Sequence, residues 1–294
     1  MRVFVTGGTG LIGSAVVAEL LTHGHTVLAL TRSDASARTL DTAGADTVRG
    51  SLSDLDVLRQ GARETDGVIH LAFSHDFSTV ETIERATREE VAALATLGDV
   101  LLGTNKPIVV ASGTPHTGGR PSTEADPTPV IAGPLAGRGQ AVNDLFALTT
   151  RGVRASAVRL PRTVHNEGQG GFAGQLTDIA RRTGVAAYPG DGAQRWPAGH
   201  ALDAAVLFRL ALESAPAGTA WHAVDDEGDA VRDIVAVIGR RLNLPVESRP
   251  EAHFGPLGPV FALDQPSSST HTREALGWTP THPRLLADLE NLQP

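Results

Sequence analysis

The 294-residue sequence predicts an α/β fold, a doubly wound parallel sheet with a smaller C-terminal domain, and three observations support this class. Short β-branched segments alternate through the first half of the chain with segments whose apolar residues recur at helical spacing. A glycine-rich segment stands between the first predicted strand and the first predicted helix. Beyond Pro161 the predicted elements become shorter and turn residues more frequent. Such alternation is typical of βαβ units around a parallel sheet.

The elements follow in order from their apolar patterns. Segments rich in β-branched and apolar residues predict strands at Val3 to Thr6, Thr26 to Thr31, Thr47 to Arg49, Gly67 to Ala72, Ile108 to Ser112 and Arg154 to Leu160. Ala, Val and Leu at helical spacing predict helices at Leu11 to Thr22, Leu55 to Ala62, Thr79 to Leu102 and Gly139 to Thr150. After Pro161 we expect helices at Phe172 to Thr183, Leu202 to Glu213, Ala230 to Leu242 and Pro283 to Leu292. We therefore divide the chain into residues 1–160 and a smaller domain of residues 161–294, with the two interleaved.

Composition restricts the function further. Hydrophobic residues make up 41% of the chain and charged residues 20%, which suits a compact protein with a buried core. The 33 acidic and 25 basic residues give a net charge of −8 without a basic block, so we expect a small-molecule substrate and neither nucleic acid nor a membrane as partner. The absence of cysteine excludes disulfides, thiolate metal sites and thiol nucleophiles. With no apolar signal segment, a cytoplasmic location is the default expectation.

The glycine-rich segment Thr6-Gly7-Gly8-Thr9-Gly10-Leu11-Ile12-Gly13 is the strongest motif. Its glycines at three-residue intervals suit a tight turn, close backbone approach to a pyrophosphate, and close packing of helix on strand. The N-terminus of the following helix would face the phosphates. Residues 1–160 are therefore predicted to form a Rossmann-type dinucleotide-binding domain, in which the motif contacts the cofactor through Gly7, Thr9, Gly10, Leu11, Ile12 and Gly13.

The end of the second predicted strand bears on the choice between NAD and NADP. In NAD-binding proteins an acidic residue at this place binds the ribose 2′-hydroxyl. This sequence has Thr31-Arg32-Ser33 there. The Arg32 guanidinium and the Thr31 and Ser33 hydroxyls suit a 2′-phosphate, so we expect NADP(H) as the cofactor. The alternative is that Arg32 is a solvated surface residue.

These motifs resemble the short-chain dehydrogenase/reductase superfamily, in its extended branch. The spacing of Gly7, Gly10 and Gly13 matches that branch, and Asp66-Gly-Val-Ile-His-Leu-Ala72 resembles its fourth strand. Members are NAD(P)-dependent reductases, epimerases or dehydratases. Four further segments are similar to those of an atypical extended subgroup: His70 to Asp76, Arg159 to His165, Asp191 to Pro197 and Thr272 to Trp278.

The resemblance also implies cofactor contacts and an assembly. Asp54 stands where an adenine-contacting Asp is expected, and the segment from Pro161 to His165, including Val164, stands where relatives touch the nicotinamide end. Further cofactor contacts are expected at the ends of the fourth and fifth strands, from Leu71, Ala72, Phe73 and Ser112. A homodimer through the predicted helices at Thr79 to Leu102 and Gly139 to Thr150 is implied as well.

One departure from the superfamily concerns catalysis. Its members usually carry a Tyr-x-x-x-Lys pair on the helix after the fifth strand, in which Lys lowers the pKa of the acid/base Tyr. This chain has one Tyr, Tyr188, and one Lys, Lys106, which precedes Pro107 at the start of the fifth strand. The helix in question reads Arg138-Gly-Gln-Ala-Val-Asn143 instead. The usual catalytic acid is therefore absent.

Reduction of a carbonyl or imine still needs a proton or hydrogen-bond donor near the developing negative charge. Each candidate has a structural alternative, because hydroxyls cap turns and loop histidines are commonly surface residues. We expect no metal site, since His23 and His25 lie in a turn without a carboxylate cluster. The candidates are the hydroxyls of Ser112 and Thr114, the loop histidines His75 and His116, the orienting cation Arg138, the amide of Asn143, and Tyr188 from the second domain.

Three functions remain open. The leading hypothesis is an NADPH-dependent oxidoreductase that reduces a small carbonyl, imine or activated alkene by hydride transfer, without the usual pair. The second is a non-catalytic protein that senses NADP(H). The third is an epimerase or dehydratase that retains tightly bound NAD, against which Arg32 and the missing base both argue.

Overall fold

The computed structural model describes residues 1–74, 79–130 and 132–293, which form two compact units. The first unit comprises Met1–Ser112, Thr128–Arg159 and Ala205–Trp221, and the second comprises Gly113–Pro127, Leu160–Ala204 and His222–Pro294. The predicted boundary near residue 160 is therefore only one of the places where the chain passes between units. Residues 113–127 belong to the second unit and residues 205–221 to the first, so the domains are interleaved.

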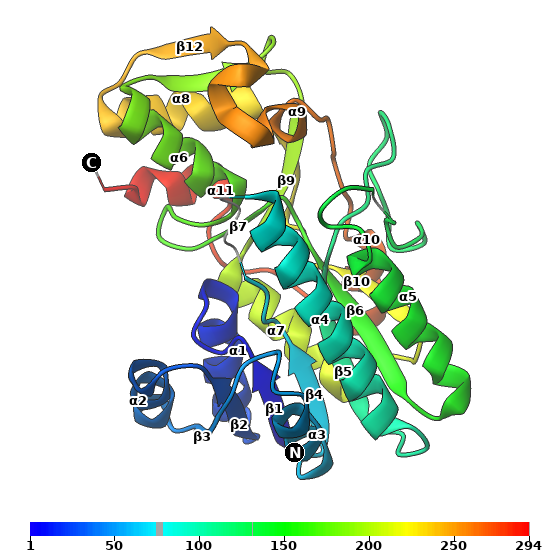
Figure 1. Ribbon diagram of the computed structural model, residues 1–294. Helices are drawn as coiled ribbons and strands as arrows, with labels where there is room; N and C mark the ends of the chain where they lie inside the picture. Colours follow the sequence, from blue (N-terminus) through cyan, green and yellow to red (C-terminus); the bar gives the residue numbers. More distant parts are fainter. Residues whose placement is uncertain (75–78, 131, 294) are drawn as a thin grey trace. The chain divides into compact units, whose positions relative to one another are not determined.

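The first unit is built on a seven-stranded sheet with the order β10-β6-β5-β4-β1-β2-β3 (Figure 1). β1 pairs in parallel with β2 and β4, β2 with β3, and β4 with β5. This confirms the predicted α/β class, and the order reverses between β1 and β4, where doubly wound sheets bind their ligands. The strands span β1 Arg2–Thr6, β2 Thr26–Thr31, β3 Asp46–Arg49, β4 Gly67–His70, β5 Pro107–Gly113, β6 Arg154–Leu160 and β10 Thr219–His222.

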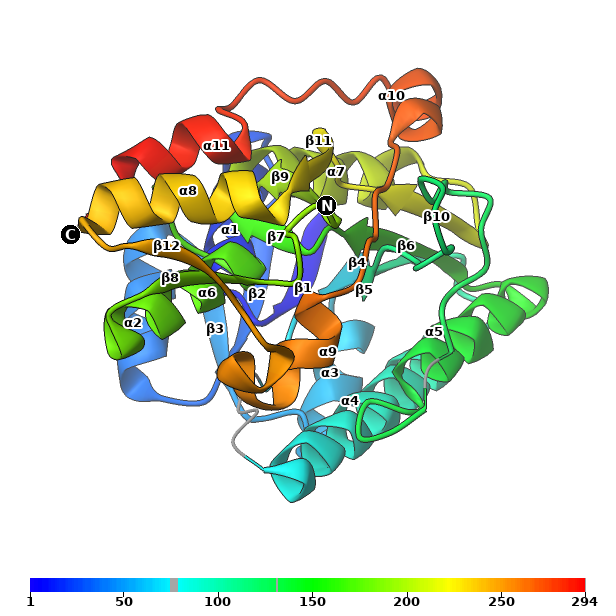
Figure 2. The same ribbon diagram turned by 90° about the horizontal axis from the view of Figure 1, so that it is seen from above.

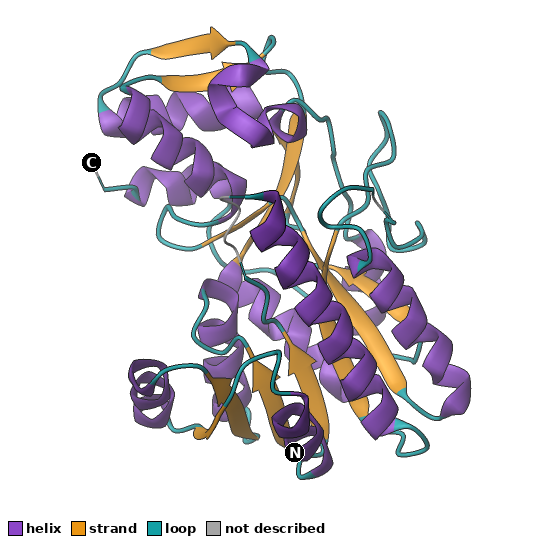
Figure 3. Ribbon diagram, in the orientation of Figure 1, coloured by secondary structure: helices purple, strands orange, loops and turns teal. Residues whose placement is uncertain are grey.

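Helices cover both faces of this sheet (Figure 3). α4 and α5 lie side by side in both views of the ribbon (Figures 1 and 2), and α3 packs against α4. α1 and α7 are joined by an ion pair between Glu19 and Arg209, with 2.7 Å between Oε1 and Nε. The helices span α1 Leu11–Thr22, α2 Asp34–Ala43, α3 Leu55–Arg63, α4 Val80–Leu101, α5 Arg138–Ala147 with a 3₁₀ turn at Leu148–Arg151, and α7 Ala201–Ser214.

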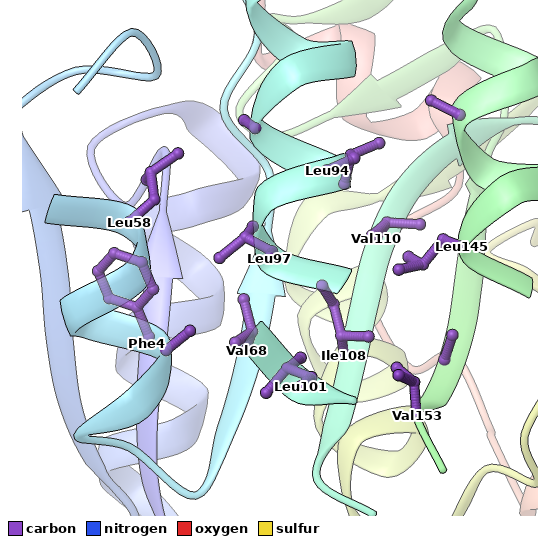
Figure 4. Packing of buried hydrophobic residues seen from close by; sticks show 14 of the residues in the cluster. Phe4, Leu58, Val68, Leu94, Leu97, Leu101, Ile108, Val110, Leu145 and Val153 are labelled. Carbon is purple, nitrogen blue, oxygen red and sulfur yellow. The ribbon is translucent and has the colours of Figure 1, made fainter. Parts of the chain in front are cut away.

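A continuous apolar layer holds α3, α4 and α5 to the sheet (Figure 4). Phe4 of β1 meets Leu58 of α3, while Leu97 of α4 lies over β4 and β5. All three side chains are completely buried. The burial of each such side chain contributes roughly 1.5–3 kcal/mol to the free energy of folding. The layer therefore holds the central strands and their carboxyl ends in fixed positions.

The second unit contains two small sheets, with the orders β11-β9-β7 and β12-β8. Its core is centred on Trp196, Phe172 and Phe261, whose rings lie 5.3 to 5.7 Å apart. The elements span β7 Thr163–His165, α6 Gly171–Thr183, β8 Ala186–Pro189, β9 Arg195–His200, β11 Asp226–Ala230, α8 Val231–Leu242, β12 Val246–Arg249, a 3₁₀ segment Glu251–Leu257, α9 Gly258–Phe261, α10 Thr270–Leu276, α11 Leu285–Asp288 and a 3₁₀ turn Leu289–Asn291.

Most predicted elements are confirmed within a few residues, and the differences have simple causes. α2 was missed because it has one buried apolar residue, Leu40, and its other residues are small or polar. β10 was not predicted because its four residues, Thr-Ala-Trp-His, include one β-branched residue. The helix expected from Pro283 to Leu292 is a single short turn, α11, continued by a 3₁₀ turn. Within the described residues, no helix is both long and apolar enough to cross a membrane.

Candidate functional site

The glycine loop joins β1 to α1 through a tight turn. Gly7 has a φ of +78° and its carbonyl accepts from the Gly10 amide at 3.1 Å. α1 begins after Gly10, which caps it without a side chain, and no acidic residue occupies its first turn. Thr9, Gly10 and Leu11 are exposed. The free amides at this helix N-terminus therefore face outward, where they suit an anionic group.

The three motif glycines differ in how much space the surrounding protein leaves for a side chain. A Cβ at Gly7 would lie 2.8 Å from the Ala72 nitrogen, and a Cβ at Gly13 would lie 2.0 Å from the Gly7 oxygen. The protein's own packing therefore excludes side chains at both positions. At Gly10 a Cβ would meet only the Gly7 oxygen, at 3.5 Å. The space over Gly10 is thus left open by the protein, which fits a pyrophosphate lying against its backbone.

The end of β2 presents a guanidinium without a carboxylate partner. Arg32 is exposed, and no ion pair to it is found among the described residues. Asp34, the acidic residue in the first turn of α2, is bound by Arg49 at 2.9 Å. Ser33 caps α2 by accepting from the Ser36 amide at 3.1 Å. A cation beside a helix N-terminus is a suitable environment for a phosphate.

Thr31 and Asp54 have local hydrogen bonds that limit their expected roles. The buried Thr31 hydroxyl donates to the Val48 oxygen at 3.3 Å, so it already has a partner in β3. Asp54 accepts from the Ser51 hydroxyl and the Ser51 amide, both at 2.7 Å and both through Oδ2. These hydrogen bonds hold the pKa of the Asp54 carboxyl below its usual value. Its contact with adenine stays a prediction.

The segment after β4 is tied to β1 through Thr6. Its hydroxyl oxygen accepts from the amides of Leu71 and Ala72 at 3.3 Å each, and it lies 3.0 Å from His70 Nδ1. The direction of the hydrogen bond between the Thr6 hydroxyl and Nδ1 depends on the tautomer of the His70 ring. His70 is buried and its Nε2 has no hydrogen-bond partner within the described residues. Leu71, Ala72 and Phe73 are half-buried at this strand end, as a cofactor contact requires.

Burial keeps His70 neutral. It lowers the pKa of His70 from 6.5 to about 4, with the nearby Glu90 carboxylate raising it and the Arg138 guanidinium lowering it. At neutral pH the ring is therefore uncharged.

Arg138 occupies the first position of α5, on the helix where the superfamily usually has its Tyr-x-x-x-Lys pair. Its Nη2 donates to Glu90 Oε1 at 2.9 Å, and its Nε donates to Glu90 Oε2. The guanidinium carbon lies 3.9 Å from the centre of the Phe73 ring. One-third of the Arg138 side chain is exposed, whereas Glu90 is buried in α4. This arrangement fixes a cation beside the end of β4, and the cation orients charge but does not release a proton near neutral pH.

The remaining candidates in the first unit are less constrained. Ser112 is half-buried near the end of β5, and Asn143 is half-buried on α5. Lys106 donates from Nζ to the carbonyl oxygens of Arg63 and Thr65, at 3.1 and 2.5 Å, and so closes the end of α3. His75 lies outside the described residues.

In the second unit, Thr114 is held by Gln265. Gln265 Nε2 donates to the Thr114 carbonyl oxygen at 2.7 Å and lies 3.3 Å from Thr114 Oγ1. Thr114 is buried, while His116 is exposed. Pro161 and Val164 are buried. Their expected cofactor contacts and the roles of these candidates stay predictions.

Tyr188 lies in β8, paired with Ser248 of β12. It is half-buried against the core of the second unit, and a Cβ at Gly192 would lie 2.7 Å from its ring. This is the environment of a packed aromatic residue, and neither the chain's one Tyr nor its one Lys is part of α5.

A buried group of histidines and carboxylates is also found in the second unit. His165, His200 and Asp288 bring possible ligand atoms within 4.8 Å of one another. However, His165 Nδ1 lies 2.8 Å from Asp288 Oδ2, and His200 Nδ1 accepts from the Leu202 amide at 3.2 Å. The first of these hydrogen bonds joins His165 and Asp288 into a histidine–carboxylate pair, and His165 Nε2 has no hydrogen-bond partner among the described residues. Burial lowers the pKa of His165, against the opposing effect of Asp288.

Two residues that the sequence analysis did not select complete these sites. The sequence pattern could have indicated Glu90, since this residue follows Ala86 by four positions and precedes Leu94 by four on the buried face of α4. A carboxylate on an apolar helix face calls for a partner. No sequence pattern indicated Gln265, because this residue lies in an irregular segment distant in sequence from Thr114.

The fold, the glycine loop and the end of β2 define a dinucleotide-binding protein of the doubly wound α/β class. The model of the NAD dependent epimerase/dehydratase family matches residues 3–223, and the chain belongs to this family. The predicted extended short-chain dehydrogenase/reductase is thereby confirmed, and the chain belongs to a superfamily of NAD(P)-dependent enzymes.

Relatives extend over nearly the whole chain. An uncharacterized protein of Schizosaccharomyces pombe is 43% identical over 297 residues, covering 98% of this chain and 98% of the relative. An uncharacterized protein of Saccharomyces cerevisiae is 41% identical over 302 residues, with the same coverage of 98% for both chains. A 2-alkyl-3-oxoalkanoate reductase of Stenotrophomonas maltophilia is 27% identical, over 80% of this chain and 74% of the relative. The crystal structure of a Thermotoga maritima UDP-glucose 4-epimerase with UDP-glucose has the same fold, with a TM-score of 0.78 at 19% identity, over 99% of this chain and 97% of that chain.

Proposed function

We propose that this protein is an NADPH-dependent oxidoreductase that reduces a small carbonyl, imine or activated alkene. The observation that carries the proposal is the environment of Arg32. An exposed guanidinium without a carboxylate partner stands at the end of β2, next to the N-terminus of α2, and the nearby Asp34 is neutralised by Arg49. A ribose 2′-phosphate brings two negative charges to this place, whereas a 2′-hydroxyl brings none.

The residues of the chain divide the remaining work. NADPH, when bound, supplies a hydride from C4 of its nicotinamide. The amides around Gly10 bind the pyrophosphate. Arg138, held by Glu90 and Phe73, offers its remaining N–H groups as hydrogen-bond donors to the substrate oxygen or nitrogen on which negative charge develops. Proton delivery is assigned to the hydroxyl of Thr114 or Ser112 or to ordered water, because Arg138 keeps its proton.

One relative is named as a reductase, and UDP-glucose 4-epimerases match the chain at similar identity. The Stenotrophomonas maltophilia relative is named as a reductase of an oxoalkanoate, which is a carbonyl compound. An epimerase or dehydratase with permanently bound NAD finds less support here, because β2 ends without an acidic residue for the 2′-hydroxyl.

Equilibrium binding of NADPH and NADH to the purified protein tests the proposal, after a check for co-purified nucleotide. We expect NADPH to bind at least tenfold more tightly than NADH, and to exchange freely. Retained NAD(H), or a preference for NADH, would overturn the use of Arg32. NADPH oxidation is then followed with a panel of small carbonyl compounds and imines.

A non-catalytic NADP(H) sensor is the second candidate, and the positions of Tyr188 and Lys106 favour it. Tyr188 is packed in the second unit, and Lys106 closes α3. Tight NADPH binding without turnover of any compound in the panel, together with different protease sensitivity of the NADPH and NADP⁺ complexes, would favour the sensor. A small-molecule substrate, a cytoplasmic location and a homodimer stay predictions.

A further inference from the structure

Arg162 is a half-buried cation in the second unit, between β6 and β7. Its Nε and Nη2 donate to Gln265 Oε1 at 3.1 and 2.7 Å, and its Nη1 donates to the Val260 oxygen at 2.9 Å. The guanidinium carbon lies 5.4 Å from the centre of the Phe172 ring and 5.7 Å from that of Trp196. The side chain is thus held in one place by neutral groups.

No acidic residue balances this charge. Within the described part of the chain, no carboxylate oxygen lies within 4.0 Å of the Arg162 nitrogens. Other arginines of the same unit have such partners: Arg195 binds Asp264 and Arg273 binds Asp225, each at 2.8 Å. Burial lowers the pKa of Arg162 to about 10, so it is charged at neutral pH. A half-buried charge without a counter-ion is partly desolvated at a cost in free energy, and its accessible side leaves room for an anion from outside the chain.

Arg162 also keeps donors for such an anion. A guanidinium has five N–H groups, and the three hydrogen bonds to Gln265 and Val260 leave one N–H on each terminal nitrogen. Two terminal N–H groups on one planar cation match the two oxygens of a carboxylate.

Gln265 connects this cation to a hydroxyl. Its Oε1 accepts from Arg162, and its Nε2 lies 3.3 Å from Thr114 Oγ1. One side-chain amide therefore fixes both a guanidinium and a hydroxyl that is a candidate donor to the substrate. A molecule that carries a carboxylate and a carbonyl a few bonds apart has the groups that Arg162 and Thr114 together recognise.

We propose that Arg162 binds the carboxylate of the substrate, and that the substrate class is an oxo acid. That the bound acid is a substrate depends on the proposed reductase function. The binding of an organic acid at Arg162 is tested without turnover.

The binding experiment uses the full chain and matched pairs of probes. Straight-chain 2-oxo and 3-oxo acids of four to eight carbons are each compared with their methyl esters, by calorimetry and by tryptophan fluorescence, since Trp196 adjoins Arg162. We expect at least one acid to bind tenfold or more tightly than its ester. Arg162→Gln should weaken that acid at least tenfold and leave the ester unchanged. Arg232→Gln, at an exposed arginine of the same unit, is the matched control and should change neither.

Gln265→Glu keeps the proposal testable if Arg162→Gln does not fold. It places a carboxylate against the Arg162 guanidinium, so the variant should fold, as followed by circular dichroism, and lose acid binding. Acid binding that survives Gln265→Glu would overturn the proposal, as would equal binding of acids and esters. Tighter binding of inorganic phosphate than of any acid would overturn the choice of a carboxylate.

Different results would contradict the proposed reductase function and the proposed carboxylate site. If NADPH reduces esters but not acids, the reductase stands and the carboxylate site falls. If NADPH binds but no compound is oxidised or reduced, while acids still bind through Arg162, the reductase falls and the anion site stands.

Discussion

Both oxygens of the buried Glu90 carboxylate bind the Arg138 guanidinium, across the contact between α4 and α5. Glu90 lies on the face of α4 that packs into the apolar layer of the first unit, and Arg138 begins α5. The pair therefore fixes a guanidinium on the helix where the superfamily usually fixes its catalytic Tyr and Lys. The guanidinium is a cation like the missing Lys, but Glu90 balances its charge, and the pair has no group that resembles the acidic Tyr hydroxyl.

Glu90→Gln is expected to lower the free energy of unfolding by about 2 kcal/mol, because it leaves Arg138 with a neutral partner in a half-buried place. Urea unfolding measures the loss. Glu84→Gln is the control on the same helix, since Glu84 makes only an exposed contact with Arg88 at 3.8 Å, and it should cost no more than about 0.5 kcal/mol. Equal losses in the two variants would contradict a stabilising role for the pair.

Arg32→Ala is expected to weaken NADPH at least tenfold and NADH less than threefold, because only the 2′-phosphate meets this guanidinium. Calorimetric titration of both nucleotides measures the ratio. Arg59→Ala, at an exposed arginine of α3 that binds Asp56, should leave both affinities unchanged. If Arg32→Ala weakens the two nucleotides equally, the cofactor preference arises elsewhere.

Gly10→Ala should separate cofactor binding from stability. Gly10 has φ −75° and ψ 171°, which alanine adopts readily, and its Cβ would make one ordinary contact. We expect the free energy of unfolding to change by less than about 1 kcal/mol and both nucleotides to bind at least tenfold more weakly. Gly13→Ala should instead cost about 3 kcal/mol or more, because its Cβ would lie 2.0 Å from the Gly7 oxygen. Normal nucleotide binding by Gly10→Ala would place the pyrophosphate elsewhere.

The lowered pKa of His70 leads us to expect that the protein loses stability in mild acid. The pKa of His70 is about 4 in the folded protein against 6.5 for an ordinary histidine, so between these values the unfolded chain binds a proton that the folded chain does not. Stability is therefore full above pH 6.5 and falls as the pH drops toward 4. Between pH 7.5 and 5.0 the wild type should lose about 2 kcal/mol more than His70→Asn, measured by urea unfolding. Parallel losses in the two proteins would show that His70 titrates normally.

Thr114→Val should lower kcat about 100-fold on a substrate found in the carbonyl and imine panel, because it removes a hydroxyl donor while keeping the side-chain shape. Thr114→Ser keeps the hydroxyl and should retain most of the activity. Ser112→Ala tests the other hydroxyl. Unchanged turnover in Thr114→Val would remove Thr114 from the mechanism.

The sheet and its cofactor loop were predictable because both depend on patterns local in sequence. The strand at Val3 to Thr6, the glycines after it and the helix from Leu11 are adjacent in the chain, and each restricts the others. The helix predicted from Thr79 to Leu102 agrees with α4 within one residue at each end, since its apolar face repeats over six turns.

The partners of the candidate residues were not predictable, because they come from distant segments. Arg138 was selected from its place on the chain, but its partner Glu90 stands 48 positions earlier. Gln265 is 151 positions from Thr114. Such pairs depend on how helices and irregular segments pack, and a single sequence carries no periodic signal for that packing.

The interleaving of the two units has a consequence for how the protein arises and changes. Residues 205–221, including β10, belong to the sheet begun by β1, although 45 residues of the other unit, Leu160–Ala204, are synthesised in between. A nascent chain that ends at residue 160 therefore lacks the edge strand β10. The sheet is completed only after most of the chain has left the ribosome. Neither unit is made of one continuous segment, so recombination that exchanges the second unit must exchange several separate segments together. Diversity in this architecture is accordingly expected to accumulate by point substitutions and loop insertions rather than by shuffling of whole domains.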